Sequence, residues 1–97
     1  MANNLDSLLT EDPDIRNGRP RIAGSGITVY RIAIWYRLGH SAEEIARQYP
    51  HLSLEGVYAA LAFYHANRDT IDADIEADEL AEQKLEAEYM EQRRIAS

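Results

Sequence analysis

Helix start and stop signals follow one another closely between residues 28 and 68, and they restrict the fold more than any other feature of the sequence. Thr28 is a good N-terminal cap for the apolar segment that follows it. Gly39 ends that segment and suits the left-handed conformation of a residue just beyond a helix. Apolar residues cover most of this first helix, so we expect it to be the most buried one, with Ile32 and Tyr36 on its inner face.

Two further helices are predicted directly after the first. Ser41 and Glu44 have the spacing of a capping box, which stabilises a helix start by about 1 kcal/mol. Pro50 pushes the preceding residue out of helical geometry, so this second helix ends at Tyr49. Ser53 then caps a third helix. The tight break between the two short helices is typical of a helix-turn-helix.

The first 28 residues are rich in turn-forming residues. Pro13, Pro20 and the pair Asn17-Gly18 exclude a helix there, and the short apolar pieces between them predict two or three short strands. The predicted fold class is therefore mainly α. It is a helix-turn-helix with short N-terminal β-strands and a long C-terminal helix.

The C-terminal segment, residues 70–97, is predicted to be an acidic, partner-binding helix that is distinct from the domain of residues 1–69. It carries nine acidic and three basic residues. Such a helix is not stable by propensity alone and needs a partner surface. The residues expected to contact that partner are Leu85, Tyr89, Arg93, Arg94 and Ile95.

The net charge of -7 is spread unevenly, since residues 1–40 hold five arginines and four acidic residues. Any nucleic-acid surface must therefore lie in the first part of the chain. Arg16, Arg19 and Arg21 could bind phosphates, or they could stay solvated or pair with nearby aspartates. The third helix would read bases through its first turns. Its candidates for this contact are Ser53, Glu55 and Tyr58.

The composition argues against several other functions. The chain has no cysteine, and its three histidines show no i,i+4 pairing with one another, so we expect no metal site. No phosphate-loop or nucleophile-elbow pattern is present, so we expect no enzyme activity, no cofactor and no small-molecule substrate. The lack of a long apolar segment and of a signal peptide predicts a cytoplasmic protein without a membrane partner.

Short motifs occur in a fixed order between residues 12 and 64. They are Asp12-Pro13, Gly18-Arg19-Pro20, Ile22, Gly24, Ile27, Val29, Gly39, Ser41, Glu43-Glu44-Ile45, Tyr49-Pro50, Leu52-Ser53, Ala60-Leu61 and Tyr64. In order and spacing they resemble the domain-of-unknown-function 433 family. Two positions depart from that family, because Ser25-Gly26 stands in place of its Thr-Arg and Thr28 in place of its proline.

The resemblance implies a winged-helix-like fold, frequently dimeric, of the kind found in bacterial antitoxins encoded beside PIN-like nuclease toxins. We therefore expect a homodimeric antitoxin-type regulator whose first domain binds operator DNA and whose C-terminal helix neutralises a PIN-like toxin. Arg93 or Arg94 would insert among the carboxylates that hold the metal ion of the toxin. The alternative is that both arginines only complement the negative end of the helix dipole. The alternative is a dimeric protein-interaction module of the same fold without DNA binding, which the acidic character supports.

Overall fold

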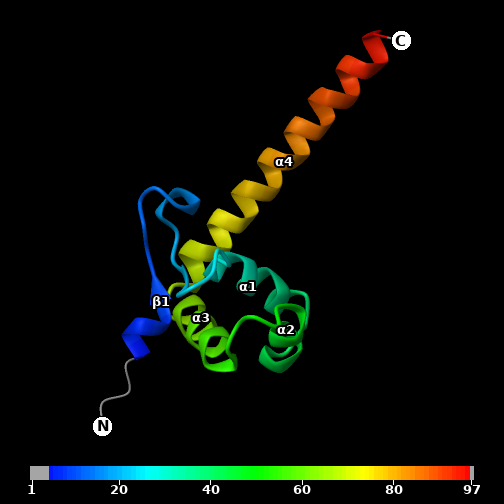
Figure 1. Ribbon diagram of the computed structural model, residues 1–97. Coiled ribbons are helices and arrows are strands. Elements are labelled where there is room, and N and C mark those ends of the chain that lie inside the picture. The colour runs from blue at the N-terminus through cyan, green and yellow to red at the C-terminus, as the bar shows by residue number, and fades with distance from the viewer. Residues whose placement is uncertain (1–4, 97) are drawn as a thin grey trace.

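Four α-helices and a two-stranded β-sheet make up residues 5–96, the part of the chain described by this computed structural model. The elements, in chain order, are 3-10 helix η1 (Leu5–Leu8), β1 (Leu9–Thr10), 3-10 helix η2 (Arg16–Gly18), β2 (Arg21–Ile22), α1 (Val29–Arg37), α2 (Ala42–Gln48), α3 (Leu54–Ala66) and α4 (Arg68–Ala96). Helices α1 to α3 and the sheet form a head, residues 5–67, from which α4 projects (Figure 1). The mainly α fold is confirmed.

The helix boundaries predicted from sequence are confirmed by their capping contacts. The Thr28 hydroxyl oxygen accepts a hydrogen bond from the third backbone N–H of α1 at 3.1 Å. The Ser41–Glu44 capping box is complete, with bonds of 3.2 and 3.0 Å. Ser53 caps α3 at 3.0 Å, and Gly39 follows α1 with a φ of 100°. These contacts are local, and neighbouring residues therefore specify them.

Helix α3 lies at the centre of the head and contacts α1, α2, α4 and both strands. Its buried residues are Gly56, Val57, Ala60, Leu61 and Tyr64. On α1, Ile32 is buried as expected, but Tyr36 is 37% exposed, and Leu38, directly after the helix, is 70% exposed. The prediction that the first helix is the most buried one is therefore wrong, because α1 has three buried residues whereas the central helix α3 has five.

Strands β1 and β2 pair antiparallel, which confirms the predicted short strands. The register places Leu9 opposite Ile22. Ile22 is buried and packs against the first turn of α3, where a Cβ added to Gly56 would lie 2.9 Å from Ile22 Cγ2. The glycine in this helix therefore permits close approach of the strand.

We expect Gly56→Ala to lower the free energy of unfolding by about 1–2 kcal/mol, because overpacking outweighs the better helix propensity of alanine. In an Ile22→Ala background, which lacks the clashing methyl group, the same change should cost clearly less, because only the contact with Ser53 Oγ at 3.0 Å remains. Thermal unfolding monitored by circular dichroism measures both effects, as a fall of roughly 4–8 °C per kcal/mol. An equal loss in both backgrounds would contradict this account.

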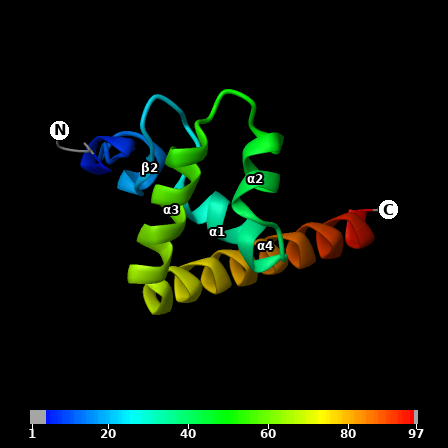
Figure 2. The same cartoon turned by 90° about the horizontal axis from the view of Figure 1, so that it is seen from below.

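Helix α4 packs on the head only through its first turns. Ile71 and Ile75 are 1% and 2% exposed and belong to the same core as α1 and α3. Every described side chain from residue 76 onward is exposed. The core therefore includes residues on both sides of the boundary predicted at residue 69. We call residues 79–96 the arm, and its length gives the molecule extents of 65 × 29 × 26 Å (Figures 1 and 2).

Candidate partner-binding arm and the contacts that position it

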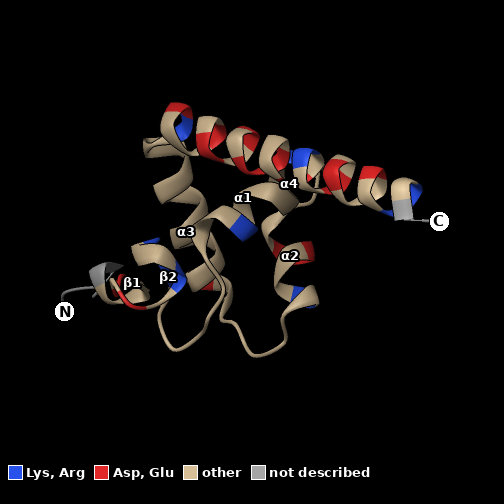
Figure 3. Ribbon diagram, turned by 90° about the horizontal axis from the view of Figure 1, so that it is seen from above, with Lys and Arg blue, Asp and Glu red and all other residues tan. Residues whose placement is uncertain are grey.

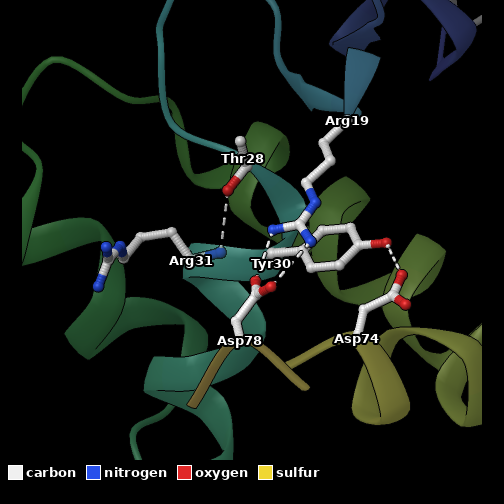
Figure 4. A network of polar contacts seen from close by, with 6 residues as sticks. All are labelled: Arg19, Thr28, Tyr30, Arg31, Asp74 and Asp78. Carbon is white, nitrogen blue, oxygen red and sulfur yellow. Dashed lines mark hydrogen bonds and ion pairs between the residues drawn. The ribbon is translucent and has the colours of Figure 1, made fainter. Parts of the chain in front are cut away.

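Two carboxylates of α4 bind an arginine and a tyrosine of the head (Figure 4). The Arg19 guanidinium donates hydrogen bonds to the carboxylate of Asp78 at 2.9 and 3.5 Å. The same guanidinium lies over the ring of Tyr30, 4.1 Å from the ring centroid. The Tyr30 hydroxyl donates to Asp74 Oδ2 at 2.7 Å. These contacts join the segment before α1 and the first turn of α1 to the second and third turns of α4.

Burial and hydrogen bonding shift two pKa values in this cluster. Removal from water raises the pKa of Tyr30 to about 12, and the hydrogen bond to Asp74 adds to that effect. The hydrogen bond to Asp78 raises the pKa of Arg19. The side chain of Asp78 is 51% exposed, so solvent screens the ion pair and limits it to about 0.5–1 kcal/mol. The ion pair orients α4 more than it stabilises it.

A second cluster joins the base of α4 to α1 and α3. The Tyr64 hydroxyl donates to Asp72 Oδ1 at 2.8 Å, and burial followed by this bond raises the pKa of Tyr64. Arg37 of α1 lies 3.8 Å from Asp72 and 3.9 Å from Glu76. Arg68 lies 3.6 Å from the same Asp72. The acidic side of this part of α4 thus faces basic side chains, and Figure 3 shows how acidic residues follow the length of α4.

Alkaline pH should weaken the docking of α4. Because its folded pKa is raised, Tyr30 contributes stability below the unfolded value of about 10, and this is lost as pH rises through about 12. We therefore expect the thermal midpoint to fall over this window. Tyr30→Phe cannot ionise and should show a smaller fall, although Tyr64 shifts in the same direction. Identical profiles for the two proteins would contradict the assignment.

The three arginines expected to bind phosphates lie in different environments. Arg19 is held by Asp78, a residue of α4 rather than one of the nearby aspartates. Arg21 Nε donates to the backbone carbonyl of Ser25 at 3.1 Å, and its buried Nη1 has no hydrogen-bond partner within residues 5–96. Arg16 is exposed, with a left-handed φ of 52°. The structure therefore does not bring the three guanidinium groups together as one free surface.

The start of α3 presents acidic rather than basic groups. Ser53 uses its hydroxyl as the helix cap, and Glu55 is exposed. The Tyr58 hydroxyl donates to Glu43 Oε1 of α2 at 2.6 Å, which lowers the pKa of Glu43 and raises that of Tyr58. Helix α3 contains no lysine or arginine. Carboxylates at this surface would repel the phosphates of a duplex.

The residues expected to contact a partner all lie on the arm. Leu85, Tyr89 and Ile95 are 66%, 58% and 75% exposed. The guanidinium carbon of Arg93 lies 5.9 Å from the centroid of the Tyr89 ring, and Arg94 pairs with a glutamate one turn earlier at 2.6 Å. Two other apolar residues of the arm are exposed but were not among those expected to contact a partner. They are Leu80 and Met90.

Within residues 5–96, no three histidine or acidic side chains come together as potential metal ligands. In the same part of the chain, no helix combines the length and the apolar character needed to cross a bilayer. The described residues form a small, mainly α head with a projecting acidic helix.

Residues 9–64 match the family described as "Protein of unknown function (DUF433)". This segment is more than half of the chain, and the protein belongs to the DUF433 family. The match extends from β1 to near the end of α3. Helix α4, with the arm, lies outside it.

One curated relative is the "Uncharacterized protein y4eO" of Sinorhizobium fredii (strain NBRC 101917 / NGR234), 33% identical over 60 residues. That match covers 62% of this chain and 27% of the relative, so the chain spans about a quarter of that protein's length. The crystal structure of a DUF433 member protein from Anabaena variabilis ATCC 29413 is similar, with a TM-score of 0.66 and 28% identity. The structural match covers 74% of this chain and 71% of that one.

Proposed function

We propose that this protein is an antitoxin-type regulator whose arm binds and neutralises a partner protein, a PIN-like nuclease in the setting that the family resemblance implies. The arm is the observation that carries the proposal. It leaves the head as a continuous helix, and the apolar side chains of Leu85, Tyr89 and Ile95 are 66%, 58% and 75% exposed. A helix of this kind is marginal in water alone, and exposed apolar surface is typical of a protein-binding site.

The decisive experiment uses the purified chain and the purified nuclease encoded by a neighbouring gene. We expect the chain to suppress RNA cleavage in proportion to its concentration, with complete suppression near equal molar amounts. A scrambled-sequence arm of the same composition on the same head serves as the control. Full nuclease activity in the presence of excess chain would refute the proposal.

The arginine pair near the end of the arm has a proposed role in this inhibition. Arg93 or Arg94 would enter the carboxylate cluster that holds the divalent metal of the nuclease and displace the ion. Replacing both residues with alanine should then abolish inhibition. Replacing both with lysine keeps the positive charge at the end of the helix, so this variant still complements the helix dipole. Unchanged inhibition by the alanine variant would remove this role and leave the dipole explanation.

A second candidate is a protein-interaction module of the same fold that does not bind DNA. It is favoured by the internal contacts of Arg19 and Arg21 and by the lack of basic residues in α3. Binding of the chain to the promoter DNA of its own operon, measured at increasing salt concentrations, distinguishes the two candidate functions. Several phosphate contacts would make affinity fall steeply with salt, whereas the module would not bind even at low salt. Homodimerisation stays a prediction, which light-scattering mass measurement tests.

A further inference from the structure

Helix α4 carries one stripe of residues at alternating spacings of four and three. The stripe consists of Ile71, Ile75, Asp78, Glu82, Leu85, Tyr89 and Gln92. This spacing is typical of the seam between two packed helices. The head covers the first half of the stripe, where the isoleucines are buried and the aspartate binds an arginine. The second half continues in the same register along the arm, where every side chain is exposed.

A notch marks the place where the head stops covering the stripe. It has a volume of about 300 Å³ and lies between α1 and α4. Its lining includes Thr28 just before α1, Arg31 and Ile34 from α1, and Ile75 and Glu82 from α4. In Figure 4 the side chain of Arg31 points away from the Arg19–Asp78 pair. A segment that packed along the exposed stripe would enter this notch and contact the head as well as the arm.

One polar residue of the stripe is paired with a basic residue of the head. Asp78 is bound by the Arg19 guanidinium at 2.9 Å, and that guanidinium stacks on an aromatic ring. Glu82 is the next polar position, and it has no ion pair within residues 5–96. Glu86 and Glu88 flank the exposed apolar pair on the arm. A partner that covers these positions must bring cations to them.

A second copy of the chain does not meet that requirement. In a two-fold pair centred between Leu85 and Tyr89, residues near the axis face their own copies. Glu86 and Glu88 would then meet like charges, which destabilises helix pairing. The occupant is therefore a different molecule with the opposite charge.

We propose that the arm docks a helix of a partner protein that presents apolar residues at coiled-coil spacing with lysine or arginine on both flanks. One end of that helix enters the notch beside α1. The inference rests on the proposed function only in taking the arm as the binding segment, and it adds the chemistry of the surface that binds there.

The test uses the full chain and a designed helical peptide of three heptads, with leucine at the core positions and lysine on both flanks. Fluorescence anisotropy should show binding that weakens with salt. Leu85→Asp with Tyr89→Asp should weaken it by about tenfold or more, because two apolar contacts are lost. Glu82→Gln should weaken binding by about threefold and make its salt dependence shallower. A twin peptide with glutamate flanks should not bind.

The matched control places two aspartates on the other side of the same arm, as Leu80→Asp with Met90→Asp, and should bind like the natural chain. The inference would be overturned if this control lost as much binding as the Leu85→Asp, Tyr89→Asp variant, or if both peptides bound equally well. It would also be overturned if the chain associated with itself and Leu85→Asp with Tyr89→Asp abolished that association. Nuclease inhibition is a separate readout. If the chain binds the peptide but does not inhibit the nuclease, the proposed function is wrong and the inferred partner chemistry stands. If it inhibits the nuclease but does not bind the peptide, the proposed function stands and the inferred partner chemistry is wrong.

Discussion

Replacing Ile71 and Ile75 with alanine should lower the free energy of unfolding by about 4–8 kcal/mol. Each side chain is almost fully buried against α1 and α3, and removing such a group from a core costs about 2–5 kcal/mol. A domain of this size is stabilised by only about 5–15 kcal/mol in total. The double variant should therefore be largely unfolded or close to its midpoint at room temperature.

Urea unfolding followed by circular dichroism and by Trp35 fluorescence measures this loss. The matched control is Leu80→Ala with Leu85→Ala, two exposed residues of the same helix, and should change stability by less than about 1 kcal/mol. A variant in which helix content falls but the tryptophan transition stays in place would contradict the expectation. That outcome would mean that residues 1–69 fold without α4.

Replacing Leu85 and Tyr89 with aspartate should abolish inhibition of the nuclease, with a loss of affinity of about a hundredfold or more. Each of the two exposed side chains would bury apolar surface on a partner, and full burial contributes about 1.5–3 kcal/mol to binding. Each new carboxylate would lose its water at the interface without a cation placed to pair with it. A hundredfold loss corresponds to about 2.8 kcal/mol. The free energy of unfolding should stay unchanged, because neither residue touches the head.

The control for this prediction is conservative at one of the same positions. Tyr89→Phe keeps the ring and should retain inhibition within a few fold, since its hydroxyl has no hydrogen bond within residues 5–96. Inhibition constants from RNA cleavage, together with thermal midpoints, provide the comparison. Normal inhibition by the aspartate variant would place the binding surface elsewhere on the molecule.

Local signals made the helix boundaries predictable from the sequence. A cap such as Ser53, or a glycine such as Gly39, acts on backbone groups within a few residues, so its effect can be read without the fold. The close contact at Gly56 could not be predicted from local signals of this kind. The strand residue that approaches it, Ile22, is 34 positions away, and no local pattern identifies it.

The contacts that position α4 could not be predicted in the same way. Asp78 is a polar residue among apolar members of the stripe on α4, and it binds Arg19, 59 positions earlier. Its partner depends on the direction in which α4 leaves α3. That direction is set at Asn67, whose backbone (φ -130°, ψ 32°) ends α3 and whose amide donates to the Phe63 carbonyl at 3.0 Å. A single residue at this corner decides which surfaces meet.

Helix α4 runs without a break from a buried base to an exposed tip, so the arm continues the helical register of the core residues. Its 18 residues reach about 27 Å at 1.5 Å per residue, in a bearing fixed by the core. Adding one residue to the helix before the arm would swing the outward-facing side chains by about 100° around the axis. While the arm is helical, its side chains are therefore held at one distance and one rotation from the head.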